Sequence, residues 1–195
     1  MTDPRIDELL DFWLGPLDAE GFSDAAHQQR WFQKSDDFDR ELEERFGALH
    51  RAAAAGELDE WRKTPRGRLA LIVLLDQLSR NLHRDTPGMF AQDPEALALA
   101  KEALALGDEA TLAPQERYFL YMPFMHSEDP SDQEKCVALF EAAQARYPGN
   151  FDPKWAVAHR DIVVRFGRFP HRNAILGRES TAEERAFLEE PGSSF

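Results

Sequence analysis

The sequence contains one cysteine, Cys136, among its 195 residues. A lone cysteine cannot close a disulfide within the chain, and secreted domains that need covalent support usually carry paired cysteines. The first residues, MTDPRIDELLDFWLG, also lack the basic region and the long apolar stretch of an export signal. Both features indicate a protein of the reducing cytoplasm, and we expect a cytoplasmic location.

Long hydrophobic runs and positive charge are scarce as well. The most apolar stretch, LALIVLLDQL, is interrupted by Asp76 and is shorter than the roughly 18 apolar residues of a membrane span. Lys and Arg number 23 against 36 Asp and Glu, so the formal net charge is −13. A chain of this charge repels nucleic acid and anionic membranes unless a local basic patch overrides it. We therefore expect neither a nucleic acid nor a membrane as partner.

The sequence motifs of common catalytic and metal sites are missing. There is no HExxH, CxxC, P-loop or GxGxxG pattern, and Ser79 and Ser180 lack the context of a nucleophile elbow. The histidines are too scattered to indicate a metal site by their spacing. The sequence predicts no metal and no cofactor, and it leaves open whether the protein is an enzyme.

The sequence does contain clear helix starts and helical hydrophobic periodicity. Proline follows a capping residue at 3–4, 64–65, 93–94 and 152–153, a pattern typical of the first turn of a helix. Helices are predicted over residues 4–14, 24–33, 36–54, 65–82, 94–106, 114–126, 131–147, 153–166 and 180–189. The last opens with Ser180 and Glu183 at the spacing of a capping box. No strand pattern of convincing length occurs, so we expect one all-α domain over residues 1–195, with about eight or nine helices.

Two of these helices indicate how the others pack. Residues 65–82 include LALIVLL, which is hydrophobic on all sides and predicts a central helix, called the hub helix below. Cys136, Phe140, Ala143 and Pro148 have the small, aromatic, small, proline spacing of the second helix of a tetratricopeptide (TPR) repeat. The preceding helix fits that repeat poorly. We expect a TPR-like stack of antiparallel helices without a regular array.

The hub helix carries polar residues that its packing does not require. Asp76 lies among leucines, where an unpaired carboxylate would be costly to bury, and Arg80 follows it by four residues on the same face. Asn81 and Arg84 extend that face into the next loop. Two interpretations remain open: an ion pair that ties the hub helix to a neighbour, or a functional carboxylate at the floor of a pocket.

The C-terminal region concentrates positive charge in this acidic chain. Six basic residues and one acid, Asp161, lie between positions 154 and 178. The basic residues are Lys154, Arg160, Arg165, Arg168, Arg172 and Arg178. Phe166 and Phe169 are interleaved with them and require burial, so the segment is expected to fold inward. Arginines held against a core need carboxylate partners or a bound anion. Asp76 is one such partner for Arg172, and a phosphate or carboxylate ligand is another.

Histidines accompany these arginines. His159 follows Trp155 by four residues and so points with the apolar face of its helix, which is typical of a core histidine as well as of a ligand-binding one. His126 and His171 lie near the ends of predicted elements. These three histidines are the candidates for proton transfer in any catalytic reaction.

The polar segments also resemble a known family. The stretches LLDQLSRNLHRDTPGMFAQDPEALALA and AHRDIVVRFGRFPHRNAILGRESTAEERAFL, with LLDFWLG, RWF and ERYFLYMPFMHSED, are similar to the bacterial domain of unknown function 924. Its recurrent element D-Q-x-x-R-N-x-x-R corresponds here to Asp76, Gln77, Arg80, Asn81 and Arg84, and its element F-P-H-R-N-x-x-L-G-R to Phe169, Pro170, His171, Arg172, Asn173, Leu176, Gly177 and Arg178. The chain departs at Leu78-Ser79, where such sequences more often have Phe-Pro. The resemblance implies an all-helical, TPR-like fold and no agreed activity.

Two functions follow as hypotheses. In the first, a small anionic ligand binds between the hub helix and the C-terminal Arg/His segment, with hydrolase- or transferase-like chemistry. Its ligand-binding residues would be Asp76, Arg80, Asn81, Arg84, Arg160, Arg165, Arg172 and Asn173. In the second, a TPR-like surface binds a protein or peptide partner, and the polar residues only lock helices together.

Overall fold

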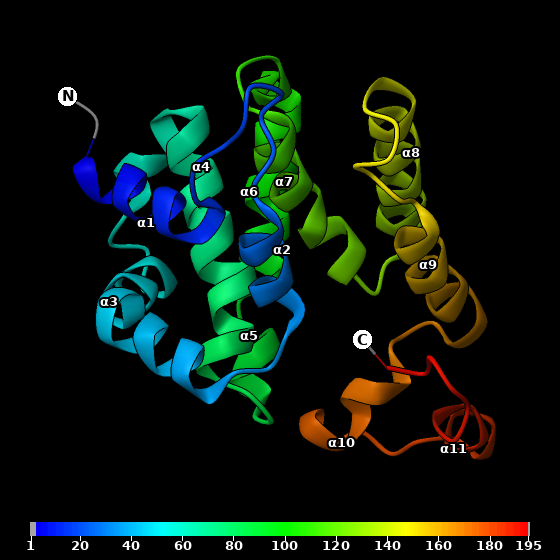
Figure 1. Ribbon diagram of the computed structural model, residues 1–195. Coiled ribbons are helices and arrows are strands. Elements are labelled where there is room, and N and C mark those ends of the chain that lie inside the picture. Colours follow the sequence, from blue (N-terminus) through cyan, green and yellow to red (C-terminus); the bar gives the residue numbers. More distant parts are fainter. Residues whose placement is uncertain (1–2, 195) are drawn as a thin grey trace. The chain divides into compact units, whose positions relative to one another are not determined.

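The computed structural model describes residues 3–194 and shows the helical elements of Figure 1. The chain divides into two compact units. The N-terminal unit contains the residues up to Arg84 and Gly88–Pro123, and the C-terminal unit contains Asp85–Pro87 and the residues from Phe124 on. The single domain expected from the sequence stays a prediction.

The all-α prediction is confirmed: across residues 3–194 the regular elements are helical, and the extended pairing consists of one isolated bridge between Leu17 and Ser23. The helix count differs from the prediction. The described residues form ten helices if the three consecutive elements of the hub helix are counted as one, instead of eight or nine. One helix that the sequence analysis did not predict is a single turn, α10 (Asn173–Leu176), in the C-terminal basic segment.

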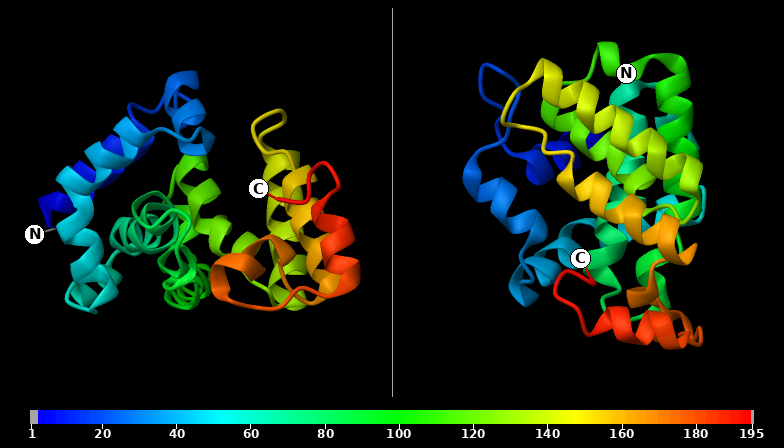
Figure 2. Two further views of the ribbon diagram at one scale, coloured as in Figure 1. Left: turned by 90° about the horizontal axis from the view of Figure 1, so that it is seen from below. Right: turned by 90° about the vertical axis from the view of Figure 1, so that its right-hand side faces the viewer.

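The N-terminal unit is built around the hub helix. Its helices are α1 (Pro4–Leu14), α2 (Ala25–Phe32), α3 (Asp36–Ala54), α4 (Pro65–Ile72), η2 (Val73–Leu78), α5 (Ser79–Leu82) and α6 (Asp93–Leu106), with α7 (Pro114–His126) crossing the division after Pro123. The hub helix consists of α4, η2 and α5, and it packs against α1, α3 and α6. Its apolar residues from Leu69 to Leu75 are almost completely buried. The left view of Figure 2 looks nearly along the hub helix. The prediction of a central helix is confirmed.

Helix starts follow the capping signals in the sequence, with one correction. Asp3 accepts a hydrogen bond from the Arg5 amide, and Thr64 accepts one from the Gly67 amide. The predicted capping box at Ser180 and Glu183 is wrong by one residue: Thr181 and Glu184 form it. Both pairs have the required spacing of three, and in the structure the Thr181 hydroxyl accepts from the Glu184 amide while the Glu184 carboxylate accepts from the Thr181 amide.

The C-terminal unit combines an antiparallel helix pair with a compact C-terminal segment. The pair consists of α8 (Pro130–Arg146) and α9 (Lys154–Phe166), which run side by side in the right view of Figure 2. After α9 come η5 (Pro170–Arg172), α10 and α11 (Ala182–Leu188). Ile162, Val163, Phe169 and Phe187 form the core of this segment. Phe169 is fully buried, so the predicted inward folding of the basic segment is confirmed.

Among the described residues, no helix combines the length and the hydrophobicity that crossing a membrane requires.

Candidate functional site

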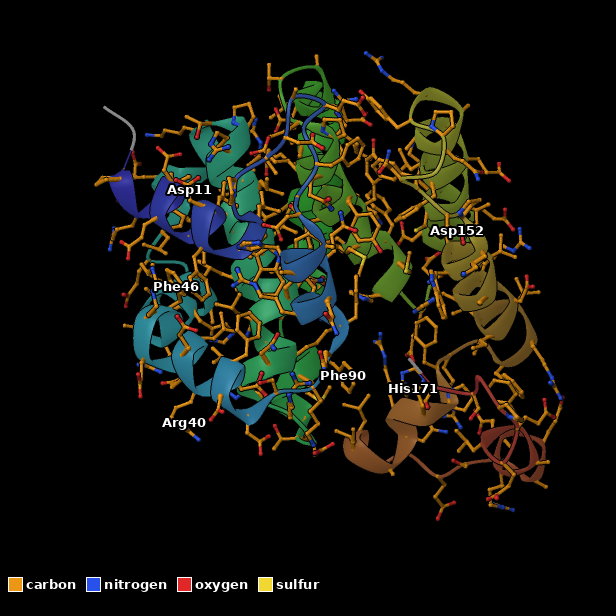
Figure 3. The ribbon with its side chains drawn as sticks, in the orientation of Figure 1. Asp11, Arg40, Phe46, Phe90, Asp152 and His171 are labelled. Carbon is orange, nitrogen blue, oxygen red and sulfur yellow. The ribbon has the colours of Figure 1, made fainter. Side chains whose placement is uncertain are left out.

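The first polar cluster lies on the hub helix and is called the hub polar cluster: Asp76, Gln77, Arg80 and Asp93. Arg80 Nη1 lies 3.3 Å from Asp76 Oδ1 and 3.1 Å from Asp93 Oδ1. Gln77 Nε2 donates to Asp76 Oδ2 at 2.5 Å, and Arg80 also lies over the ring of Phe90. Phe90 is labelled in Figure 3. The ion pair that the sequence indicated for Asp76 is therefore present.

Local helix geometry explains how one guanidinium serves this cluster. Residues Val73–Leu78 form a π-helical turn, a rare geometry often found at functional positions. Within this arrangement Arg80 Nη1 donates to the backbone carbonyl of Asp76 at 2.5 Å as well as contacting its carboxylate. Burial acts to lower the pKa of Arg80, but Asp76 and Asp93 outweigh it and hold the pKa above its ordinary value. Arg80 is therefore a firmly charged, doubly paired group.

The polar residues at the end of the hub helix and in the following loop bind α3. Asn81 Nδ2 donates to Asp39 Oδ1 at 2.7 Å, and Arg84 Nη2 donates to the same oxygen at 3.0 Å while its Nε contacts Oδ2. Asp39 was not singled out from the sequence, because an acid in the first turn of a helix is ordinarily a solvent-exposed residue. Asn81 and Arg84, both candidate ligand residues, are thus engaged by a carboxylate of their own unit.

A buried His–Ser pair near the hub helix has the wrong polarity for nucleophile activation. His50 Nε2 lies 2.9 Å from Ser79 Oγ, and the Ser79 hydroxyl donates to the Leu75 carbonyl at 2.6 Å. The single hydroxyl proton is used on Leu75, so Ser79 accepts from the imidazole. Burial, with a smaller contribution from His83, lowers the pKa of His50 to about 4. We interpret this pair, which sequence reasoning missed, as a structural hydrogen-bond chain.

The second polar cluster lies in the C-terminal unit and is called the Arg/His cluster: His126, His159, Phe169, His171 and Arg172. Phe169 is its central ring, with centroids 5.6 Å from His159 and 5.6 Å from His171, and Arg172 Cζ lies 4.6 Å from the ring centre. The ring centroids of His126 and His159 are 6.5 Å apart. The three histidines proposed from the sequence therefore gather around Arg172, from α7, α9 and η5 (His171 is labelled in Figure 3).

Hydrogen bonds fix two members of this cluster. Arg172 Nη2 donates to the backbone carbonyl of His126 at 3.0 Å, and Arg172 is only 6% exposed. His159 Nδ1 lies 2.7 Å from the carbonyl of Trp155. A carbonyl only accepts, so Nδ1 carries the proton and Nε2 is the ring atom that can take up another. The tautomer of His159 is therefore set by its own helix.

The cluster keeps two of its imidazoles, His159 and His171, neutral. Burial lowers the pKa of His159 to about 3, with smaller contributions from His126, His171 and Arg172, although the Trp155 carbonyl acts in the opposite direction. Burial likewise lowers the pKa of His171 to about 4, reinforced by Arg172 and opposed by Glu128. His171 is partly exposed, whereas His126 and His159 are buried. At neutral pH, Arg172 supplies positive charge and His159 and His171 supply none.

A bidentate ion pair between Arg178 and Glu128 holds the segment that carries this cluster. Arg178 Nη1 and Nη2 lie 2.8 Å and 3.0 Å from the Glu128 oxygens, and Nη2 also donates to the Phe169 carbonyl. Glu128 accepts from the Phe169 amide at 2.8 Å. Burial raises the pKa of Glu128, but Arg178 and the Phe169 amide outweigh it and lower the pKa below its ordinary value. Sequence reasoning missed Glu128 because its partners lie 41 and 50 residues away.

A second ion pair fastens the end of the segment. Arg168 Nε and Nη2 donate to Glu184 at 2.6 Å and 2.8 Å, and Arg168 thereby holds the pKa of Glu184 down to about 2. Asn173, a candidate ligand residue, donates to Ser180 Oγ at 3.0 Å and accepts from Arg178 Nε at 2.9 Å. The amide of Asn173 therefore supports the loop.

Two other candidate ligand residues belong to surface ion pairs. Arg160 lies 2.8 Å from Asp161 and 3.8 Å from Glu134, and Arg165 lies 3.0 Å from Glu183. These carboxylates are all more than half exposed. Most of the positive charge in the C-terminal region is thus paired with acids of α8, α9, α11 and nearby loops.

The remaining predictions concern Asp76 and metals. Asp76 and Arg172 belong to different units and each has partners within its own unit, so a direct contact between them stays a prediction. Within residues 3–194, no group of three or more His, Cys, Asp or Glu side chains is placed to hold a metal ion. Cys136 is fully buried, and burial raises the pKa of its thiol to about 12.

These features define an all-helical protein with two buried polar clusters. The chain belongs to the family described as "Bacterial protein of unknown function (DUF924)", which it matches over residues 9–192. It is similar to the "Structure of Protein of Unknown Function ATU0120 from Agrobacterium tumefaciens", with 40% sequence identity and a TM-score of 0.81 over 95% of this chain and 97% of that one. No curated protein matches the sequence.

Proposed function

We propose that the protein binds a small oxyanion, such as a phosphate or carboxylate, at the Arg/His cluster. The observation that carries this proposal is a buried guanidinium, Arg172, fixed over Phe169 and surrounded by three imidazoles from separate elements. A guanidinium offers several donors in one plane and suits the oxygens of carboxylates and phosphates. Because His159 and His171 are neutral, they supply hydrogen-bonding groups to the site without adding charge to it.

The surrounding ion pairs support such a site by fixing its geometry. The pairs of Arg178 with Glu128 and of Arg168 with Glu184 hold the segment that carries the cluster. Binding groups held in advance lose little conformational entropy when a ligand arrives. In this proposal Asp76, Arg80, Asn81 and Arg84 hold the N-terminal unit together and do not contact the ligand.

The same cluster offers groups for hydrolase- or transferase-like chemistry. We propose that this chemistry takes place in the cytoplasm, because a protein with one buried cysteine is suited to a reducing compartment. The Nε2 atom of His159 can accept a proton, because Nδ1 is committed to the Trp155 carbonyl. His171 is the partly exposed histidine and is the group that a ligand entering from solvent would meet first. Binding is the primary proposal, and proton transfer by these imidazoles is its chemical extension.

The test is calorimetric titration of the purified protein with inorganic phosphate, sulfate and citrate, together with thermal unfolding. A ligand at about 100 times its dissociation constant should stabilise the protein by about 2.7 kcal/mol. Arg172→Gln should abolish that protection, and His171→Asn, at a partly exposed position, should weaken it. Arg160→Gln, in an exposed ion pair on α9, is the matched control and should leave binding unchanged. Lack of binding by all three anions would refute the proposal.

A TPR-like interaction module is the second candidate. Trp155 and Val164 on α9 are large hydrophobic side chains that are 51% and 64% exposed, which favours contact with a protein or peptide. They are nine residues apart and therefore lie on opposite sides of the helix. A peptide along one side of α9 would reach only one of them, so Trp155→Ala and Val164→Ala should affect peptide binding unequally.

A further inference from the structure

We propose that Gln133 is a positioning residue of the Arg/His cluster, which sets the place of Arg172 through the carbonyl groups at the end of α7. This inference rests on the proposed function and adds a residue outside the cluster to the same site. Arg172 Nη2 donates to the His126 carbonyl at 3.0 Å. The carbonyls on either side, those of Met125 and Ser127, accept from Gln133 Nε2 at 2.7 Å and 2.6 Å. All of these residues belong to the C-terminal unit.

The end of α7 explains why side chains are needed there. The last carbonyl groups of a helix have no N–H partner within the helix, so side chains or water must satisfy them. Because α7 ends at His126, its last carbonyls include those of Phe124, Met125 and His126. Gln133 Nε2 also lies 3.3 Å from the Phe124 carbonyl. One amide and one guanidinium thus serve the consecutive carbonyls from Phe124 to Ser127.

Gln133 is held where its amide can serve these carbonyls. It lies in the first turn of α8 and is fully buried. The turn between α7 and α8 is itself fixed, because Ser127 Oγ accepts from the Asp129 amide at 3.2 Å and donates to Asp132 Oδ2 at 2.9 Å. Among the described residues none donates to Gln133 Oε1, so the side chain acts through its NH2 group. A methionine of similar length would offer the carbonyls no donor.

His126 belongs to the cluster by its side chain as well as by its carbonyl. Its ring centroid is 6.5 Å from that of His159, so a shift of the α7 end would move an imidazole and the acceptor of Arg172 together. It would also loosen one of the contacts that fix the Arg172 guanidinium over Phe169. Binding groups that are held in advance lose less conformational entropy when a ligand arrives. Gln133 should therefore raise the affinity for an oxyanion without touching it.

Nuclear magnetic resonance of ¹⁵N-arginine-labelled protein tests the placement of Arg172 without any ligand. A guanidinium that is hydrogen-bonded in a fixed position rotates slowly about its Cζ–Nη bonds, so its Nη protons give separate signals. We expect such signals for Arg172 in the natural chain and averaged signals in Gln133→Met, and Arg172→Lys assigns them. Gln144→Met, the same change at an exposed position of α8, is the matched control and should leave them unchanged. Unchanged Arg172 signals in Gln133→Met would overturn the inference.

Calorimetric titration with sulfate at pH 7 tests the consequence for binding. Gln133→Met should bind sulfate about tenfold more weakly than the natural chain, which is the lower end of what metal sites lose when a residue that orients a ligand is removed. Gln133→Asn keeps the NH2 group on a shorter side chain, so it should lose only part of the affinity. Gln144→Met should bind sulfate as the natural chain does.

Urea unfolding separates positioning from a purely structural role. Leu139→Ala truncates a buried leucine six residues further along α8, so it should lower stability and leave sulfate affinity unchanged. Gln133→Asn should bind sulfate more tightly than Gln133→Met even if it is no more stable. A sulfate affinity that follows stability across these three variants would mean that Gln133 acts on the fold alone. Far-ultraviolet circular dichroism verifies folding, and Gln133→Asn replaces Gln133→Met in both comparisons if the latter does not fold.

The remaining outcomes separate this inference from the proposed function. Equal sulfate affinity in Gln133→Met and in the natural chain would refute the role of Gln133 and leave oxyanion binding intact. Failure of phosphate, sulfate and citrate to bind the natural chain would refute oxyanion binding and, with it, a role of Gln133 in binding. The arginine signals would then still show whether Gln133 places Arg172.

Discussion

The hub polar cluster and the Arg/His cluster each contain a buried arginine, but the groups around the two arginines differ. Arg80 contacts two carboxylates, Asp76 and Asp93, so its charge is neutralised by the protein itself. Arg172 contacts a backbone carbonyl and an aromatic ring, and its ionisable neighbours include the imidazoles of His159 and His171 and the carboxylate of Glu128, which also binds Arg178. The first arrangement is that of a structural ion pair, and the second is suited to a ligand that brings negative charge.

Acids of the C-terminal unit also form structural ion pairs. Glu128, Glu183 and Glu184 pair with arginines around the Arg/His cluster. Ion pairs thus secure the loop, while the centre of the cluster contains aromatic and imidazole rings. We infer that the arginines of these ion pairs belong to the scaffold, and we propose Arg172, which lies beside the imidazoles, as the binding position.

Removing Arg80 should have the largest effect on stability. Arg80→Leu leaves the fully buried Asp76 without its cation and should cost about 3 to 5 kcal/mol of unfolding free energy. Urea unfolding at pH 7 measures the change. Arg40→Ala, which breaks an exposed pair with Asp37, is the control and should change stability by less than about 0.5 kcal/mol. A loss below about 1 kcal/mol for Arg80→Leu would refute a structural role for the hub polar cluster.

A smaller loss of stability is expected when the pH is lowered, because of a buried histidine in the Arg/His cluster. The folded protein holds the pKa of His159 at about 3, so the unfolded chain binds a proton first as the pH falls below about 6.5. Stability is therefore unaffected above that pH and is lost progressively towards the folded value. Between pH 7 and pH 5 this histidine should account for about 2 kcal/mol of the loss.

His159→Asn tests that expectation, because asparagine does not titrate. Urea unfolding at pH 7, 6 and 5 should show a shallower loss of stability for the variant than for the natural chain. Gln144→Asn, at an exposed residue of α8 that carries no ionisable group, is the control and should reproduce the natural pH dependence. Equal slopes for the His159 variant and the natural chain would mean that His159 is not held neutral.

The smallest effect is expected at Arg165, a candidate ligand residue that lies in an exposed pair with Glu183. Arg165→Ala should change the unfolding free energy by less than about 0.5 kcal/mol, as is typical of exposed ion pairs. It should also leave sulfate affinity unchanged in calorimetry. A large loss of affinity would extend the binding site to the surface arginines and remove the distinction between scaffold and site.

Helix positions were predictable because their signals are local. The predicted ranges 4–14 and 36–54 coincide with α1 and α3, whose capping residues and hydrophobic spacing can be read within a few positions. The π-helical turn in the hub helix and the single turn α10 were not predictable in this way. Neither has a capping residue or a hydrophobic spacing of its own that distinguishes it in the sequence.

The candidate site was predictable in part. Inward-pointing His159 and the aromatic residues among the arginines correctly indicated that basic groups fold against a core. The partners of those groups could not be assigned, because Asp39, Asp93 and Glu128 reach their arginines from other helices or loops. Arg160 looked equivalent to Arg172 in the sequence, and only the fold separates a surface pair from a buried stack.

The central claim is that the Arg/His cluster, with neutral imidazoles at His159 and His171, binds an anion. The ring nitrogen chemical shifts of His159 test this claim most directly. Nuclear magnetic resonance of ¹⁵N-histidine-labelled protein, at pH 6 and constant ionic strength, measures protonation and tautomer together. Without sulfate we predict a neutral ring with its proton on Nδ1, and with saturating sulfate a change in the ring nitrogen shifts of His159 or of His171. A charged His159 in the absence of ligand, or histidine shifts that do not respond to sulfate, would contradict the account.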